Sequence, residues 1–246
     1  MILPHRKTQR GVLTMKQVCI YHIAEQFLYE YYFKPEDYEI LGEDKVKPLL
    51  DKAREEDAKG GIMAALQYYQ EAEDYNPVST EIRFHLIDLY FRLHRNDDLL
   101  NETKEIYPFC CTRAEIAQYY RWLGYYFLET YKPGLAAVLY RYSTLYEKSE
   151  LAENEIHFLE TAMNKKMPDY AAGELAEKIS HAGFPAGPSK ITLALVYKAG
   201  EEAQSEAGNS KTGKTMRQQA LDCYRMVYDL TGDEETGQRI RVLSRE

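Results

Sequence analysis

The sequence has no apolar run long enough to cross a bilayer, and no apolar stretch followed by a small-residue cleavage site near its start. We therefore predict a cytoplasmic protein that lacks both a membrane segment and a signal peptide. Residues 1–14 carry a basic group (Arg6, Lys7 and Arg10) and are expected to form a flexible, solvated leader, for which Met15 is an alternative natural start.

Cysteine is scarce, and its spacing fits neither a zinc site nor a redox motif. The four cysteines are Cys19, Cys110, Cys111 and Cys223, and none of the six histidines lies beside a cysteine or a second histidine at metal-ligand spacing. We expect reduced thiols that are partly buried in helices, and we expect no metal and no cofactor.

Positive charge is in deficit, because 31 Lys and Arg face 39 Asp and Glu, a formal net charge of -8. This balance argues against a phosphate-binding surface, so no nucleic-acid partner is predicted. Gly (14) and Pro (9) are modest in number, and runs of Val and Ile are few. An apolar share of 45% is enough to bury a core. A charged share of 28%, together with the few Val and Ile runs, suits helices better than sheets, and the fold we expect is all-α.

One stretch, GGIMAALQYYQEAEDYNP over residues 60–77, organises the rest of the chain. Ala65, Tyr69 and Ala72 fall four and three residues apart, on one face of a predicted helix. That helix is expected to end at Asn76-Pro77, because the residue before a proline is pushed out of the α region.

The same three positions recur along the chain, first 34 residues later (99 minus 65) and then after a further 37 (136 minus 99). The recurring sets are Leu99, Thr103 and Ile106; Ala136, Tyr140 and Ser143; and, less regularly, Ala172, Ala176 and Ile179, and Ala220, Tyr224 and Val227.

Further helices are expected over 15–33, 45–59, 189–206 and 215–230. An acidic connector is expected at 35–44, and a helix pair after residue 150, whose second helix starts at Pro168.

The three-residue pattern resembles the second helix of a tetratricopeptide (TPR) repeat. That helix has a small residue, an aromatic residue and a second small residue at these spacings, and a proline follows it. The resemblance implies a right-handed α-solenoid of about five helical hairpins, three of them TPR-like. We expect an N-terminal helix and connector over 15–44, the TPR-like hairpins over 45–182, and a C-terminal hairpin and capping helix over 183–246. Gly124 occupies the small position of a first helix, where it would let two helices approach closely.

In TPR proteins the first helix of each hairpin lines a concave groove that binds a peptide. The chaperone-type clamp of Lys, Asn and Arg is not matched, so binding of a chaperone tail is not expected. Tyrosine is abundant at 22, and adjacent pairs such as Tyr68-Tyr69 favour packing between helices, with an aromatic groove as the alternative. The resemblance places eight residues near the groove: Arg54, Phe84, Asp88, Phe91, Arg92, Arg121, Tyr125 and Leu128. Its arginines would bind a partner's carboxylates.

A phosphate-loop pattern, G-x-x-x-x-G-K-[ST], is matched from Gly208 to Thr215. A true phosphate loop follows a buried strand, whereas EEAQSEA precedes this one and only 31 residues follow it (246 minus 215). A loop between two helices is the favoured interpretation, and whether it binds an anion stays open.

We therefore predict a non-catalytic scaffold or adaptor that binds a protein segment in the groove. The alternative is a peptide-sensing regulatory domain of a larger signalling or transcription system, and a third hypothesis is an enzyme that uses the glycine-rich loop.

Overall fold

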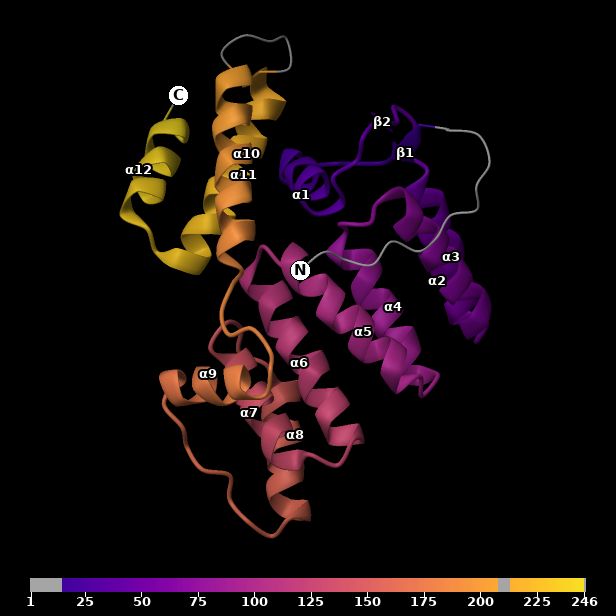
Figure 1. The fold of residues 1–246 in the computed structure, drawn as a ribbon, viewed down its shortest axis with the longest axis vertical. Coiled ribbons are helices and arrows are strands. Elements are labelled where there is room, and N and C mark those ends of the chain that lie inside the picture. Colours follow the sequence, from indigo (N-terminus) through magenta and orange to yellow (C-terminus); the bar gives the residue numbers. More distant parts are fainter. Residues whose placement is uncertain (1–14, 208–212, 246) are drawn as a thin grey trace.

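The computed structural model describes residues 15–207 and 213–245, which form twelve α-helices, one 3-10 turn and one two-stranded sheet (Figure 1). The protein is therefore all-α apart from that sheet over the described residues. The helices are α1 (Ile23–Phe33), α2 (Val46–Ala58), α3 (Ile62–Tyr75), α4 (Thr80–Arg92), α5 (Asn96–Ile106), α6 (Arg113–Glu129), α7 (Pro133–Thr144), α8 (Glu150–Ala162), α9 (Ala172–His181), α10 (Lys190–Ala207), α11 (Gly213–Thr231) and α12 (Glu234–Leu243); the 3-10 turn is η1 (Tyr107–Phe109).

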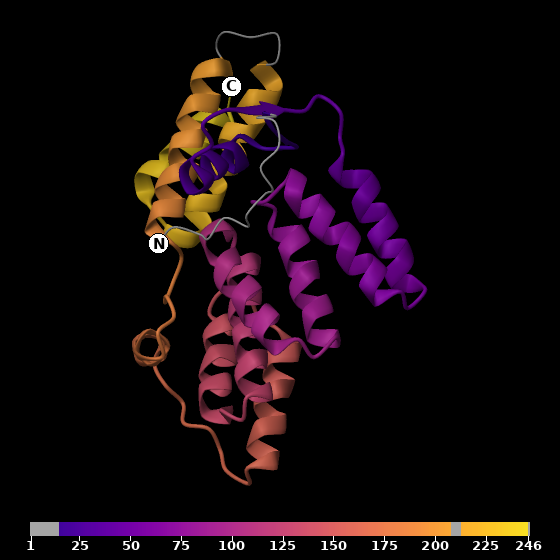
Figure 2. The same cartoon turned by 45° about the vertical axis from the view of Figure 1, so that its right-hand side comes forward.

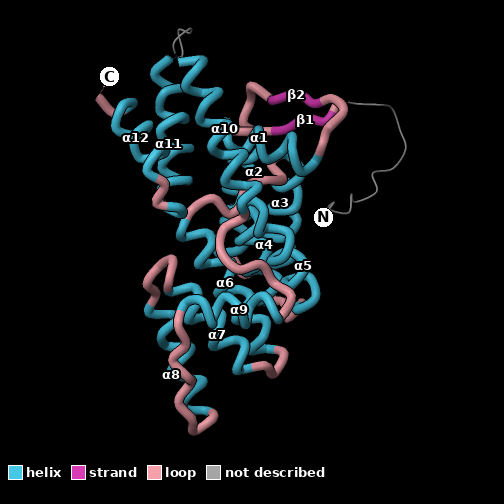
Figure 3. Tube along the Cα trace, turned by 60° about the vertical axis from the view of Figure 1, so that its left-hand side comes forward, coloured by secondary structure: helices cyan, strands magenta, loops and turns pink. Residues whose placement is uncertain are grey.

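The first predicted helix is wrong over its N-terminal half, because α1 begins at Ile23 and a strand precedes it. This strand, β1 (Lys16–Val18), pairs in parallel with β2 (Tyr38–Ile40), and α1 is the crossover between them (Figure 3). The Cys19 amide donates to the carbonyl of Tyr75 at 2.8 Å, so contacts with α3 hold this segment extended. The predicted acidic connector contains β2.

The helices from α2 to α7 pack in the order of the sequence, each against the next (Figure 2). Helices α8 and α9 both pack on α7. The recurring three-residue sets of α3, α5 and α7 are all buried, at 0–2% exposure. Their apolar and aromatic members belong to one continuous apolar core that runs from α2 to α9. Ala172 departs from this pattern because it is exposed at the start of α9.

Gly124 brings α6 and α7 close together, as its place in the sequence predicts. A Cβ atom at Gly124 would lie 3.1 Å from the Tyr140 ring. The C-terminal hairpin repeats this arrangement, because a Cβ atom at Gly200 of α10 would lie 3.0 Å from the ring of Tyr224 in α11. Both rings are buried, so each fills the space that the facing glycine leaves open.

Helix α9 begins later than predicted, at Ala172 instead of Pro168. Glu174 explains this start, because its carboxylate accepts the Ala171 amide proton at 2.9 Å and so satisfies one free donor at the helix end.

The N-terminal helix also packs against the C-terminal hairpin, far along the sequence. Helix α1 contacts α10, and the Ile23 amide donates to Gln219 Oε1 of α11 at 2.8 Å. The hydroxyls of Tyr32 and Thr192 lie 3.3 Å apart. A second apolar cluster joins α1, η1, α10 and α11, and α12 packs on α11.

None of the helices in the described ranges is both long enough and apolar enough to span a membrane.

Candidate functional site

The three arginines predicted to grip a partner are all paired within the chain. Arg92 donates two hydrogen bonds to the Asp57 carboxylate in a bidentate arrangement, at 2.6 and 2.9 Å, and a third to Asp88 at 3.4 Å. Arg54 donates to Glu81 at 2.7 Å, and Arg121 to Glu147 at 3.0 Å. The pairs with Asp57, Glu81 and Glu147 each join two helices or a helix to a loop, so these arginines hold neighbouring segments together.

The predicted apolar residues divide into a buried one and a partly exposed group. Phe84 is only 8% exposed and belongs to the core. Phe91 packs edge-on against Tyr125, with ring centroids 4.3 Å apart, and also against Trp122 at 6.0 Å. The structure thus brings α4 and α6 together through their aromatic side chains.

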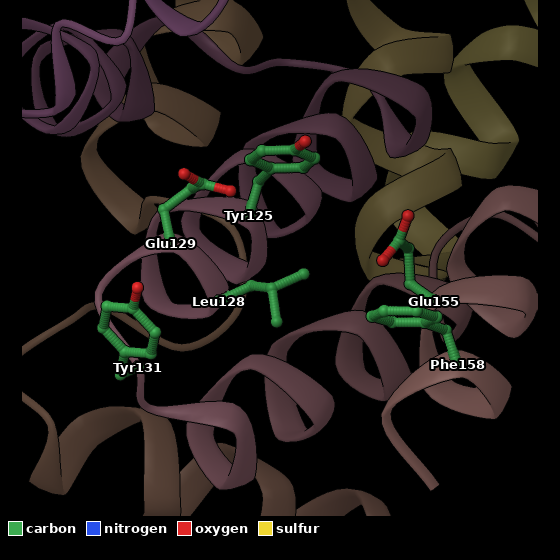
Figure 4. A pocket seen from close by; sticks show the side chains of 6 residues that line it. All are labelled: Tyr125, Leu128, Glu129, Tyr131, Glu155 and Phe158. Atoms are coloured by element: carbon green, nitrogen blue, oxygen red, sulfur yellow. The ribbon is translucent and has the colours of Figure 1, made fainter. Parts of the chain in front are cut away.

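Tyr125 and Leu128 lie in a surface hollow of about 440 Å³ between α6 and α8 (Figure 4). Leu128 and Phe158 point toward one another across it, with Glu155 beside Phe158 on the same helix. The remaining lining residues are Glu129 and Tyr131, at the end of α6 and just after it.

Exposure of two aromatic side chains distinguishes this hollow from the core. Tyr131 is 93% exposed and Phe158 is 60% exposed. Tyr131 also has a φ of 58°, which is uncommon for a residue other than glycine. Large exposed aromatic side chains beside a hollow are typical of contact surfaces.

Helix α8 presents a partly apolar face here. Leu151, Glu155 and Phe158 are spaced four and three residues apart and therefore share that face. Leu151 is 60% exposed, as is Phe158. Leu151 does not line the hollow but shares a face of α8 with Glu155 and Phe158, which do.

Carboxylates supply the charge of the hollow. Burial raises the pKa of Glu155, and the pKa of Tyr125 is raised by burial and by the nearby carboxylates Glu129 and Glu155. Among the described residues that line the hollow there is no lysine and no arginine. The site therefore suits a positively charged group next to an apolar one.

Four residues of the hollow were missed by sequence reasoning, namely Glu129, Tyr131, Glu155 and Phe158. The TPR resemblance fades beyond residue 150, so it offers no groove positions on α8. A signal was nevertheless present, because Leu151 and Phe158 lie on one face of a helix whose remaining surface is largely charged.

A buried arginine dominates the electrostatics of the interior. Arg83 is 3% exposed, contacts Glu102, lies 3.0 Å from Glu73, and donates to the Pro77 carbonyl at 2.8 Å. Its guanidinium also lies over the ring of Phe109, 5.2 Å from the centroid. This network connects α3, α4, α5 and η1. Because the Arg83 side chain is buried, we assign the network a structural role.

No candidate metal site is found on the part of the chain that is described. That part contains no group of three or more His, Cys, Asp or Glu residues arranged to hold a metal ion. All four cysteines are free and buried. The phosphate-loop match lies mostly outside the described residues, and helices α10 and α11 flank it on either side.

No family model, no curated protein and no solved structure matches this chain.

Proposed function

We propose that this protein is a non-catalytic scaffold, built as a right-handed TPR-like solenoid, that binds a protein segment in the hollow between α6 and α8. The solenoid proposal is supported by the serial packing of α2 to α7 and by the burial of the recurring small and aromatic positions. Each hairpin leaves an apolar face that its neighbour covers, which is how helical repeats share a core.

The observation that carries the binding proposal is the hollow itself, where Phe158 and Tyr131 expose their rings beside Leu128. Glu129 and Glu155 flank these apolar side chains with negative charge. The partner is therefore a segment that places an apolar side chain in the hollow and a lysine or arginine beside it.

This partner differs from the acidic segment that the sequence pattern suggests. Arg54, Arg92 and Arg121 already face carboxylates inside the chain, which lowers their capacity to attract a partner's carboxylates. The unbalanced charge of the hollow is negative, as is the net charge of the chain. The partner we propose is therefore a basic segment that also carries an apolar side chain, and a cytoplasmic location stays a prediction from the sequence.

A displayed library of random peptides, selected on the whole protein, tests the proposal. Enriched sequences are expected to combine an apolar residue with a cation, and a synthetic peptide from that set should bind at least tenfold more weakly to Phe158→Ala and to Glu155→Lys. Met63→Ser is the matched control, because Met63 is 55% exposed on α3 and does not line the hollow. Equal binding to all variants, or enrichment of acidic sequences, would contradict the proposal.

A further inference from the structure

Helix α8 carries two apolar stripes, of which one is covered by the rest of the chain and the other is exposed. Ala152, Ile156 and Leu159 pack into the main core. Leu151 and Phe158 form the second stripe, seven residues apart (158 minus 151), and each is 60% exposed. The next helix, α9, packs on α7, and α8 lies at the lower end of the molecule (Figure 1). The second stripe is therefore available to a partner.

Opposite charges mark the two ends of α8. Glu150 and Glu153 lie in its first turn, and Lys165 and Lys166 follow its last one. The Lys165 amide donates to the Glu160 carbonyl at 3.0 Å, which keeps the lysines at the end of the helix. All four charged side chains are exposed, and none takes part in an ion pair over the described residues.

This charge pattern also stabilises α8 itself, because carboxylates suit the N-terminus of a helix and cations suit its C-terminus. The helix dipole gives no reason for the exposed apolar stripe between the two charged ends. The stripe and the charges together describe a surface that fits a partner with the same features in reverse order.

A second α8 helix that runs antiparallel to the first has those features. Glu150 comes eight residues before Phe158 (158 minus 150), and Lys166 comes eight residues after it (166 minus 158). With a two-fold axis at Phe158, the acidic end of each helix therefore meets the basic end of the other, and the symmetry makes this contact twice. A parallel pair would instead place like charges together.

We propose that the exposed face of α8 binds the same face of a second copy of this chain, in an antiparallel pair with Phe158 at the two-fold axis. The inference rests on the proposed function, because Phe158 and Glu155 also line the hollow between α6 and α8. It names the partner segment as α8 with the residues that follow it, FLETAMNKK, which combines apolar side chains with two lysines.

The strength of the pair follows from its size. One helix face from each copy is a small contact, and interfaces below about 1,200 Å² are typical of weak and transient association. We therefore expect a monomer at low concentration and a dimer at high concentration. A weak dimer also leaves the hollow open to competing peptides.

The mass of the whole protein in solution tests the proposal, measured by sedimentation equilibrium from low micromolar to several hundred micromolar protein. The average mass should rise from one chain to two. Phe158→Ala and Leu151→Ser should each weaken the dimer at least tenfold, whereas Met63→Ser, at an exposed position on α3, should leave it unchanged. A wild-type protein that stays monomeric throughout would overturn the proposal, and equal association of all these variants would place the contact elsewhere.

An exchange of charges tests the antiparallel arrangement. One variant carries Lys165→Glu and Lys166→Glu, and the other carries Glu150→Lys and Glu153→Lys. Each variant alone should associate at least tenfold more weakly than the wild type, because both contacts become repulsive. An equal mixture should recover the association, since acidic ends again meet basic ends. A mixture that associates no better than the separate variants would refute the antiparallel pair.

The same variants separate this proposal from the proposed function. Their substitutions lie outside the lining of the hollow, so both proteins should bind the selected peptide as monomers. Peptide binding by a wild-type protein that never dimerises would leave the scaffold proposal in place and refute the second copy as its partner. A charge-dependent dimer that binds no peptide would support self-association and contradict the wider scaffold.

Discussion

Gly124 of α6 lies against the ring of Tyr140 in α7, so closely that a Cβ atom would be 3.1 Å from Cε1 of the tyrosine. The two residues are 16 positions apart (140 minus 124), and the same separation relates Ala53 to Tyr69 in the first hairpin, formed by α2 and α3. All these side chains are buried. A small residue in one helix therefore accompanies a large ring in the other.

The α4–α5 hairpin reverses the two sizes. Here Ile87 occupies the position of the small residue and Thr103 that of the tyrosine, again 16 residues apart (103 minus 87), and both are 0% exposed. In this hairpin the larger residue is therefore on the first helix and the smaller one on the second.

Replacing Gly124 with alanine is expected to destabilise the protein by about 1–2 kcal/mol, because the Tyr140 ring must shift and this outweighs the better helix propensity of alanine. Urea unfolding followed by circular dichroism measures the change. Gly134→Ala is the control, since a Cβ atom there has nothing within 4 Å, and it should be neutral or stabilising by up to about 1 kcal/mol. Equal destabilisation by both variants would contradict the close-approach explanation.

Tyr140→Phe is expected to leave stability unchanged or to raise it by up to about 1 kcal/mol, because the Tyr140 hydroxyl is buried with no hydrogen-bond partner among the described residues. Tyr120 gives the matched comparison. Its hydroxyl accepts from the Gly187 amide at 2.8 Å and donates to the Pro185 carbonyl at 3.1 Å, so Tyr120→Phe should cost about 1 kcal/mol. The two unfolding free energies, measured side by side, are predicted to move in different directions or by clearly different amounts.

The Arg83 cluster predicts a pH dependence of stability. Burial raises the pKa of Glu102 to about 7, against the lowering effect of Arg83, and the carboxylates Glu73 and Glu105 add to the rise. A carboxyl group with a raised pKa binds a proton more tightly in the folded state. It therefore stabilises the fold fully below the pKa of the unfolded chain, and this stability is lost as the pH rises through about 7.

Glu102→Gln should flatten this slope between the pKa of an unfolded glutamic acid and about pH 7. Thermal melts at a series of pH values would measure the effect. Glu105→Gln, a more exposed neighbour 3.8 Å from Arg83, should leave most of the slope in place. A Glu102→Gln protein with an unchanged slope would show that another group titrates.

The four thiols are expected to react slowly with a thiol-specific reagent in the native protein and fully in denaturant. All four are buried, and burial raises the pKa of Cys110, Cys111 and Cys223, which lowers the thiolate fraction. Labelling followed by mass spectrometry would count the modified residues. Rapid labelling of any cysteine under native conditions would contradict this burial.

The all-α class and most helices could be predicted because their signals are local. Apolar spacing marks the buried face of each helix, and Asn76-Pro77 and Gly60-Gly61 mark where helices end. The start of α1 could not be predicted in this way. The segment before it has helical spacing, yet Cys19 hydrogen-bonds across to α3, and such a tertiary contact overrides a local preference.

The predicted groove shows what local reasoning leaves out. The sequence pattern could nominate Arg92 from its place on a helix. It could not show that Asp57, 35 residues away, already pairs with this arginine. Likewise Tyr125 was nominated, while its neighbours in the hollow come from α8, where the repeat pattern fades. Whether the nominated residues bind a partner stays a prediction.

The packing of α1 on α10 and α11 has a consequence during synthesis. Leu28 and Tyr29 of α1 are buried in the cluster that includes Val196 of α10, which the ribosome adds much later. From the end of α1 to the start of α10 there are 157 residues (190 minus 33), or roughly 8–30 s of translation. During that interval the apolar side of α1 awaits its partner, so the nascent chain is most exposed to aggregation, and most in need of a chaperone, before α10 emerges.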